Sequence, residues 1–391
     1  MRQVAHFSIR ICAELEVRRA CLSVRRFGME VKMTALKPLQ IGRLTAPIPV
    51  IQGGMGVGVS LSGLAGAVAA EGGIGIISTA QIGYREPGYD RSPHETNLRQ
   101  ISAEIERARR LAPGGIIGVN IMVATRGYEE YVREAVLAGT DLIISGAGLP
   151  VTLPQAVREA EEEIGAQGRT LLAPICSSRK SAEVIFHYWK KKYDRIPDLV
   201  VIEGPLAGGH LGFDRKQLED IGGLHYEAEA ARILEFVRGK AKEAGKPVPV
   251  VMAGGIYDRQ DADPWLKLGM DGVQMATRFV TTWECDAAQA YKDAYLKAEK
   301  EDIVLVKSPV GMPGRAIRNA FLERAQKGRI PHGPCHGCIK TCSPADTPYC
   351  ITEALVNAVK GDVDNGLIFC GSNAWRAQRM EHVKDIMAEF A

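Results

Sequence analysis

Eight short apolar segments, each separated from the next by a longer stretch, constrain the fold of this 391-residue chain more than any other feature. The segments are Pro49–Gln52, Ile74–Ile77, Ile116–Asn120, Asp141–Ser145, Thr170–Pro174, Leu199–Glu203, Val248–Met252 and Gly272–Met275. Short runs that are apolar almost throughout are typical of strands buried on both faces. The stretches between them have the periodicity of amphipathic helices. Such helices are predicted at Tyr128–Ala138, Pro154–Ile164, Ser181–Lys192 and Tyr226–Ala244.

This alternation predicts an α/β fold, because eight strand–helix units over roughly 240 residues match the pattern and size of a (β/α)8 TIM barrel. A doubly wound open sheet is the alternative. We expect the barrel to span residues 37–325. A non-core extension over residues 1–36 would precede it, and a cysteine-rich, helical extension over residues 326–391 would follow it.

Composition limits the classes of partner. Hydrophobic residues make up 46% of the chain, charged residues 24%, and the net charge is +3. These values are ordinary for a soluble globular protein and give no electrostatic reason to expect nucleic acid or an anionic membrane as a partner. The N-terminal extension contains Glu14 and Glu16 among its arginines, which fits neither a secretory signal nor a transit peptide. We therefore expect a cytoplasmic protein that acts on a small-molecule substrate.

The segment Glu203–Gly212, with the sequence EGPLAGGHLG, follows the sixth apolar segment directly. In a barrel, the carboxyl ends of the strands carry the functional loops. Two adjacent glycines allow the backbone to approach a planar ligand closely, and His210 after them could transfer a proton. The alternative is a loop histidine that only hydrogen-bonds to the backbone.

The loops after the seventh and eighth segments predict a phosphate site. Gly254 and Gly255 follow the seventh segment, and Thr277 and Arg278 follow the eighth. These two loops commonly bind phosphate in barrels, through backbone N–H groups and a short helix. Glycines that only make tight strand-to-helix turns are the alternative.

These motifs, with those at Gln52–Gly56, Gly118–Met122, Ser145–Gly148 and Gln274–Phe279, form a recognisable set. Over about residues 38–325, the chain resembles the nitronate monooxygenases, also called 2-nitropropane dioxygenases. It also resembles their relative, the flavin-dependent type II enoyl-acyl-carrier-protein reductase. The resemblance implies a barrel that binds FMN non-covalently, with His210 as the catalytic residue, and a homodimer. The cofactor-binding positions that it implies are Gly54, Met55, Gly56, Asn120, Glu203, Gly208, Gly209, Gly254, Gly255, Gln274, Met275, Ala276 and Thr277.

The resemblance leaves two activities open. A monooxygenase would oxidise an alkyl nitronate with O2 to a carbonyl compound and nitrite, and His210 would orient the anion or deprotonate a neutral nitroalkane. A reductase would use NAD(P)H and FMN to reduce an enoyl thioester. The sequence Gln-Gly-Gly-Met that starts at Gln52 and the acidic residue Glu203 favour the reductase. Ala276 stands where monooxygenases of this family commonly have a glycine. We expect the monooxygenase. The alternatives are the reductase, a non-catalytic flavin- or metal-binding regulatory protein, and a flavin-free isomerase of phosphorylated metabolites.

Four cysteines are grouped beyond the eighth apolar segment. Cys335, Cys338, Cys342 and Cys350 have the spacing Cys-x2-Cys-x3-Cys-x7-Cys. Four thiols this close in a cytoplasmic protein predict a metal site, because a disulfide scaffold belongs to small secreted chains. The compact spacing favours a [4Fe–4S] cluster, and zinc is the main alternative. Free thiols or a disulfide remain open.

The rest of the C-terminal region is expected to cover the barrel mouth. Helices are predicted at Ile351–Lys360 and Ala374–Phe390, joined by the unusually apolar linker Gly366–Asn373. We expect this linker to pack on the barrel mouth. Lys307–Asn319 is predicted to be a loop over the active site.

Overall fold

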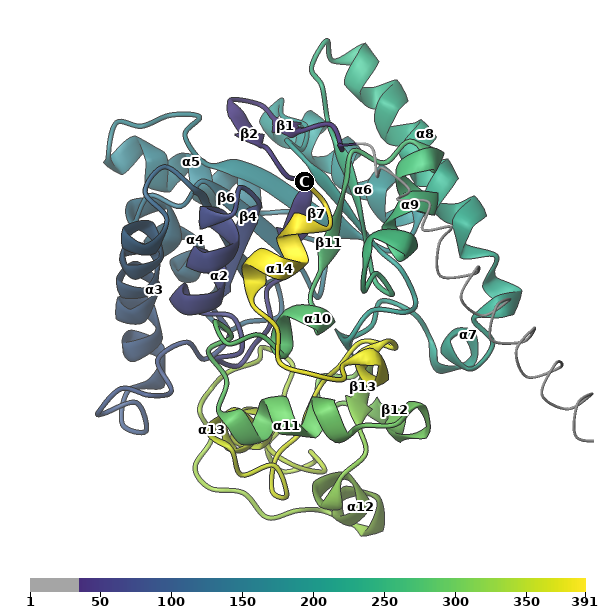
Figure 1. Cartoon of the computed structure of the whole chain (residues 1–391). Coiled ribbons are helices and arrows are strands. Elements are labelled where there is room, and N and C mark those ends of the chain that lie inside the picture. Colours follow the sequence, from purple (N-terminus) through teal and green to yellow (C-terminus); the bar gives the residue numbers. More distant parts are fainter. Residues whose placement is uncertain (1–34) are drawn as a thin grey trace, which may run out of the picture. The chain divides into compact units, whose positions relative to one another are not determined.

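The fold is a closed eight-stranded parallel barrel, which confirms the predicted (β/α)8 TIM barrel (Figure 1). The computed structural model describes residues 35–391, so nearly all of the extension predicted for residues 1–36 lies outside the described part. The barrel strands are β3 (Val50–Gln52), β4 (Ile74–Ser78), β5 (Ile116–Met122), β6 (Leu142–Gly146), β7 (Leu171–Cys176), β8 (Val200–Glu203), β10 (Val250–Ala253) and β11 (Gly272–Met275). Every predicted apolar segment forms one of these strands.

Helices connect the strands on the outside of the barrel, as the amphipathic stretches predict. They are α2 (Ser62–Ala70), α3 (Pro93–Leu111), α4 (Tyr128–Leu137), α5 (Leu153–Glu163), α6 (Arg179–Tyr193), α8 (Tyr226–Glu243) and α9 (Arg259–Leu268). Each buries an apolar stripe against the strands, and the fully buried Trp189 of α6 is an example. Short helices α7 (Arg215–Glu219) and α10 (Thr277–Val280) follow β8 and β11. Among the described residues, no helix is long and apolar enough to cross a membrane.

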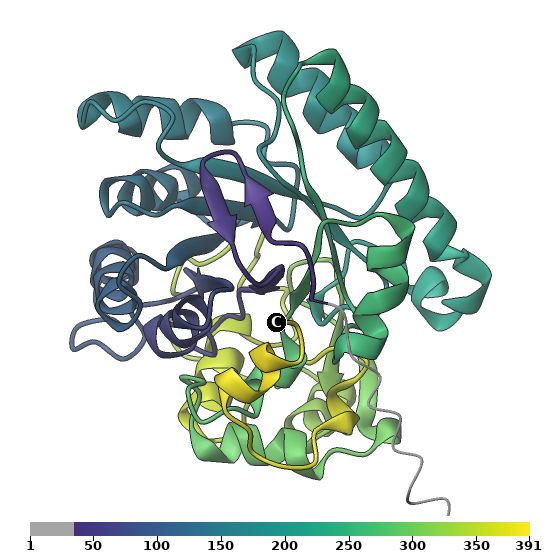
Figure 2. The same cartoon turned by 45° about the horizontal axis from the view of Figure 1, so that its top comes forward.

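A small hairpin covers the amino end of the barrel (Figure 2). Strands β1 (Leu39–Ile41) and β2 (Leu44–Ala46) pair antiparallel and point their apolar residues inward. These side chains join the interior apolar cluster that also contains Ile51 of β3. Burial of this cluster closes the amino end, so ligand access is left to the carboxyl ends of the strands.

A cap formed mainly by elements that follow the last barrel strand lies at those carboxyl ends (Figure 1). It contains the three-stranded sheet β12 (Ile303–Lys307), β13 (Pro313–Ile317) and β9 (Gly209–His210). It also contains α11 (Gln289–Lys297), α12 (Ala320–Lys327) and α13 (Ile351–Lys360). Part of the predicted loop Lys307–Asn319 is therefore strand β13. Residues 36–391 form one compact unit.

The predicted helix over Ala374–Phe390 is wrong. The structure has a 3-10 turn at Ala374–Arg376 and a separate helix α14 (Val383–Ala388). The 3-10 turn is fixed to the barrel, because Arg376 pairs with Asp258 at 2.5 Å and with Asp261 at 2.6 Å. These ion pairs lie far apart in sequence, so helical periodicity could not reveal them.

Candidate active site

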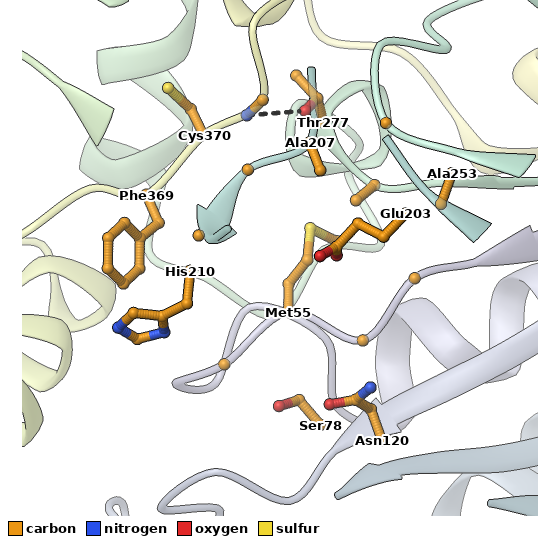
Figure 3. Close-up of a pocket in the computed structure, with 18 of the residues that line it drawn as sticks. Met55, Ser78, Asn120, Glu203, Ala207, His210, Ala253, Thr277, Phe369 and Cys370 are labelled. Carbon is orange, nitrogen blue, oxygen red and sulfur yellow. Dashed lines mark hydrogen bonds between the residues drawn. The ribbon is translucent and has the colours of Figure 1, made fainter. Parts of the chain in front are cut away.

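One pocket lies at the mouth of the barrel and is lined by residues at or just after the carboxyl ends of the eight barrel strands. Figure 3 shows some of these residues around the pocket. The predicted site residues that line it are Gly54, Met55, Gly56, Asn120, Glu203, Gly208, Gly209, His210, Gly254, Gly255, Gln274, Ala276 and Thr277. Met275 is the exception, because its side chain points into the core and is 1% exposed. Its carbonyl accepts a hydrogen bond of 2.7 Å from the N–H of Gly53 and so fixes the start of the first loop.

The glycines allow the pocket walls to lie close together. A Cβ atom on Gly54 would lie 2.4 Å from the Cβ of Asn120. Gly254 has a φ of +94°, which side chains rarely adopt, and a Cβ there would lie 2.9 Å from the backbone N of Ala207. Larger residues at these two positions would therefore distort the site itself.

His210 lies in strand β9, and its partner in the register is Gly314 of β13. Its Nε2 atom lies 2.6 Å from Oγ of Ser308, and its ring meets the edge of Phe369 with centroids 5.0 Å apart. Burial lowers the pKa of His210 to about 4, because the charged imidazolium is poorly solvated there. The imidazole is therefore neutral at neutral pH, as a general base must be.

Several residues that shape the site were not predicted from the sequence. The hydroxyls of Tyr295 and Tyr291 donate to the carbonyl of Phe369 at 2.6 and 3.4 Å, and so position the ring beside His210. The buried guanidinium of Arg315 donates to the carbonyls of Pro205, at 2.9 Å, and Ala207. These groups belong to the cap. In the sequence, the unusually apolar linker Gly366–Asn373 was the feature that indicated a cap over the barrel mouth.

The predicted phosphate end is assembled from the two expected loops and from the C-terminal segment. Oγ1 of Thr277 accepts a hydrogen bond of 3.2 Å from the N–H of Gly371 (Figure 3). The side chain of Asn373 donates to the carbonyl of Gly255 at 2.6 Å. Arg278, which the sequence places in the predicted phosphate site, is not available to a phosphate, so that part of the prediction is wrong. Its guanidinium pairs with Glu381 and Glu389 at 2.9 and 2.6 Å.

Glu203 presents a carboxyl group to the pocket, and no described side chain pairs with it. The hydroxyl of Tyr226 donates a hydrogen bond of 2.9 Å to the backbone carbonyl of Glu203, and not to its carboxyl group. Burial raises the pKa of Glu203 to about 7. Near neutral pH the group therefore exists in both protonation states and could either donate or accept a hydrogen bond.

We expect Glu203→Gln to stabilise the protein at alkaline pH. A carboxyl whose pKa is raised on folding stabilises the fold below its unfolded pKa and loses that contribution as the pH rises through about 7. Glutamine stays neutral, so the variant should exceed the wild type by about 1–3 kcal/mol at about pH 8.5 and by much less at about pH 4. Urea unfolding at both pH values measures this difference. An equal difference in the free energy of unfolding at the two pH values would contradict the raised pKa of Glu203.

The four grouped cysteines lie outside this pocket. All four are free thiols, and Cys335 is exposed while the others are partly buried. Within residues 35–391, no group of three or more His, Cys, Asp or Glu side chains is placed to hold a metal ion. The metal site predicted at Cys335, Cys338, Cys342 and Cys350, whether a [4Fe–4S] cluster or zinc, is therefore not supported by the side chains that the structure describes.

Comparisons with known proteins agree with this architecture. The family model described as nitronate monooxygenase matches residues 37–391. A probable nitronate monooxygenase of Staphylococcus aureus (strain Newman) is 26% identical over 316 residues, which cover 74% of this chain and 81% of the relative.

Solved structures share the fold. FabK from Thermotoga maritima aligns with a TM-score of 0.64 at 24% identity, over 88% of this chain and 94% of that chain. Nitroalkane oxidase from Streptomyces ansochromogenes aligns with a TM-score of 0.60 at 22% identity, over 88% of this chain and 96% of that chain. Because the family model matches nearly all of the described residues, this chain belongs to the nitronate monooxygenase family and is a flavin-dependent oxidoreductase.

Proposed function

We propose that the pocket binds FMN and that the enzyme oxidises alkyl nitronates with O2. Members of this family are FMN enzymes, and the residues present suit a flavin. Gly54 and Gly254 line the pocket with backbone alone, which would let a planar ring system approach it closely. The buried Oε1 of Gln274 has no hydrogen-bond partner, and a flavin ring offers an N–H donor. Bound FMN would supply the redox chemistry, and the protein would position it.

The residues around the cofactor would have separate tasks. Gly254, Gly255 and Thr277 would hold the phosphate end through backbone N–H groups and one hydroxyl, as the strand-end loops of many barrels do. Asn120 would contact the ring system from the opposite wall of the pocket. No cationic side chain is assigned to the phosphate, because Arg278 is engaged in ion pairs.

His210 carries the proposal for the reaction. A neutral imidazole that faces the cofactor pocket can remove the α-proton of a neutral nitroalkane or position a nitronate. Ser308, at 2.6 Å from Nε2, fixes the ring orientation and could share the proton. Phe369, whose ring lies against that of His210, would help to exclude water from this side of the pocket.

A second candidate is the reduction of enoyl thioesters with NAD(P)H. Two features favour it: the acid at Glu203 and the Gln-Gly-Gly-Met sequence that starts at Gln52. The likeness to FabK from Thermotoga maritima is a likeness of fold and is compatible with either activity. In this reaction a protonated Glu203 could donate to the substrate.

The two candidates are distinguished by products. We expect the FMN-loaded enzyme to release nitrite and consume O2 when it is given propyl-2-nitronate, in an amount that grows with turnover. Oxidation of NAD(P)H that depends on a crotonyl thioester should be absent. Thioester-dependent oxidation without nitrite release would reject the monooxygenase proposal in favour of the reductase.

A further inference from the structure

One wall of the pocket, formed by residues 205–210, is held from behind by an arginine of the cap. Arg315 is the middle residue of strand β13. Its guanidinium donates to the carbonyl of Pro205 at 2.9 Å and to the carbonyl of Ala207. Ala207 and His210 of this wall border the pocket, whereas Arg315 does not line it (Figure 3). The arginine and the pocket therefore lie on opposite sides of the wall.

The hydrogen bonds of Arg315 fix the direction of a backbone N–H group. The peptide bond between Ala207 and Gly208 is trans, so its C=O and N–H bonds point in opposite directions. Because the carbonyl of Ala207 points to the guanidinium, the N–H of Gly208 points to the pocket side of the wall. Within residues 35–391, no group accepts a hydrogen bond from this N–H. It is therefore a donor available to a ligand.

The wall is also fixed by the linker Gly366–Asn373. The carbonyl of Leu206 accepts a hydrogen bond of 3.1 Å from the backbone N–H of Ser372. A Cβ atom on Gly208 would lie 2.5 Å from the carbonyl carbon of Cys370, so only glycine fits between the pocket and the linker. This packing keeps the donor in one orientation before any ligand binds.

Arg315 also places a positive charge behind the wall. It is 5% exposed, and no carboxylate of the described residues forms an ion pair with it. Arg278, the other buried arginine discussed above, pairs with two carboxylates. An arginine stays charged in proteins, and a buried charge is only weakly screened by solvent. The positive charge of Arg315 therefore acts on a ligand in the pocket.

The neutral imidazole of His210 gives this charge a purpose. An anionic substrate beside His210 gains no charge compensation from a neutral ring. None of the described residues that line the pocket is a lysine or an arginine. The N–H of Gly208, with Arg315 behind it, is placed on the same wall as His210 and has the sign that an anion requires.

We propose that Arg315 is a positioning residue that makes residues 205–210 an anion-binding wall. It directs the N–H of Gly208 to an oxygen atom of an anionic substrate, and its charge strengthens that hydrogen bond. The inference rests on the proposed function only for the identity of the anion, a nitronate. A carboxylate of similar shape would be bound by the same groups.

The test measures binding rather than turnover. The full chain, loaded with FMN, is titrated with isobutyrate, an unreactive anion similar in shape to propyl-2-nitronate, and with its neutral counterpart isobutyramide. The change in flavin absorbance reports binding. We expect the wild type to bind isobutyrate more tightly than isobutyramide. Arg315→Met should weaken isobutyrate binding about ten times more than isobutyramide binding, because hydrogen bonds to charged groups are stronger than neutral ones.

Two further variants separate charge from structure. Arg315→Lys keeps the charge and should restore part of the preference for isobutyrate. The matched control is Arg318→Met, which changes an exposed arginine three residues later whose guanidinium donates to the carbonyl of Glu301 at 3.0 Å. This control should leave both affinities unchanged.

FMN content and far-UV circular dichroism, measured on the same samples, report loss of the fold. Three results would overturn the proposal: a wild type without preference for isobutyrate, equal losses for the two ligands in Arg315→Met that retains FMN, and the same selective loss in Arg318→Met. The first of these needs no variant to fold. Nitrite release from propyl-2-nitronate tests the proposed function separately. A wild type that releases no nitrite, together with a selective loss in Arg315→Met, would reject the nitronate substrate and support the anion-binding wall.

Discussion

Replacing His210 with asparagine is expected to lower kcat/KM for neutral nitroalkanes about a hundred- to ten-thousand-fold, the usual contribution of a general base. The imidazole faces the pocket beside Ser308, and asparagine keeps a polar group there but cannot accept a proton at neutral pH. Steady-state kinetics at saturating O2 measure the loss. The exposed His187→Asn is the matched control and should leave the rate unchanged.

The pH profile checks the same assignment. Because the pKa of His210 is lowered to about 4, the imidazole stays deprotonated as the pH falls through the range in which an ordinary histidine would be protonated. The wild-type rate should therefore not fall as the pH drops through about 6.5. The pH profiles of the wild type and of His210→Asn should have the same shape in this range. A variant with the full rate on neutral nitroalkanes would contradict the role of His210 as the base.

Removal of the Arg278 side chain should cause the largest loss of stability. Arg278 is 7% exposed and pairs with two carboxylates, Glu381 and Glu389, that follow it by more than a hundred residues. Arg278→Ala leaves the mostly buried Glu381 with only the exposed Arg379, at 4.0 Å, and removal of one partner of a buried ion pair typically costs about 3–5 kcal/mol. Urea unfolding should show this decrease in the free energy of unfolding.

The same variant should also weaken flavin binding, because these ion pairs hold the C-terminal segment that contributes Gly371 and Asn373 to the pocket. Arg110→Ala is a suitable control, since the ion pair of Arg110 with Glu106 is largely exposed and should contribute about 0–1 kcal/mol. Equal losses in the two variants would show that the buried ion pairs do not anchor the segment.

The barrel was predictable because its signal is local. Each strand is a short apolar run such as Leu142–Gly146, and the functional loops follow the strands directly. Strand-end glycines and His210 could therefore be assigned to one pocket before any long-range contact was known. Met275 differs from the other predicted site residues because its side chain is buried in the core, and its carbonyl accepts a hydrogen bond from Gly53 of the first loop.

The cap was less predictable because long-range contacts determine it. The short strand β9 forms only because β13, about a hundred residues later, pairs with Gly209 and His210. Arg278 follows a strand at a position that suits a phosphate, and nothing near it in sequence reveals Glu381 as its partner. The same holds for Tyr295, whose hydroxyl positions Phe369 from a distant helix.

Cofactor identification tests the central claim most directly. The full chain would be purified, reconstituted with FMN, desalted and denatured, and the released compound would be identified by mass and quantified by absorbance. The account predicts about one FMN per chain, bound non-covalently. A chain that stays folded and retains no flavin after reconstitution would contradict the assignment of the barrel pocket as a flavin site.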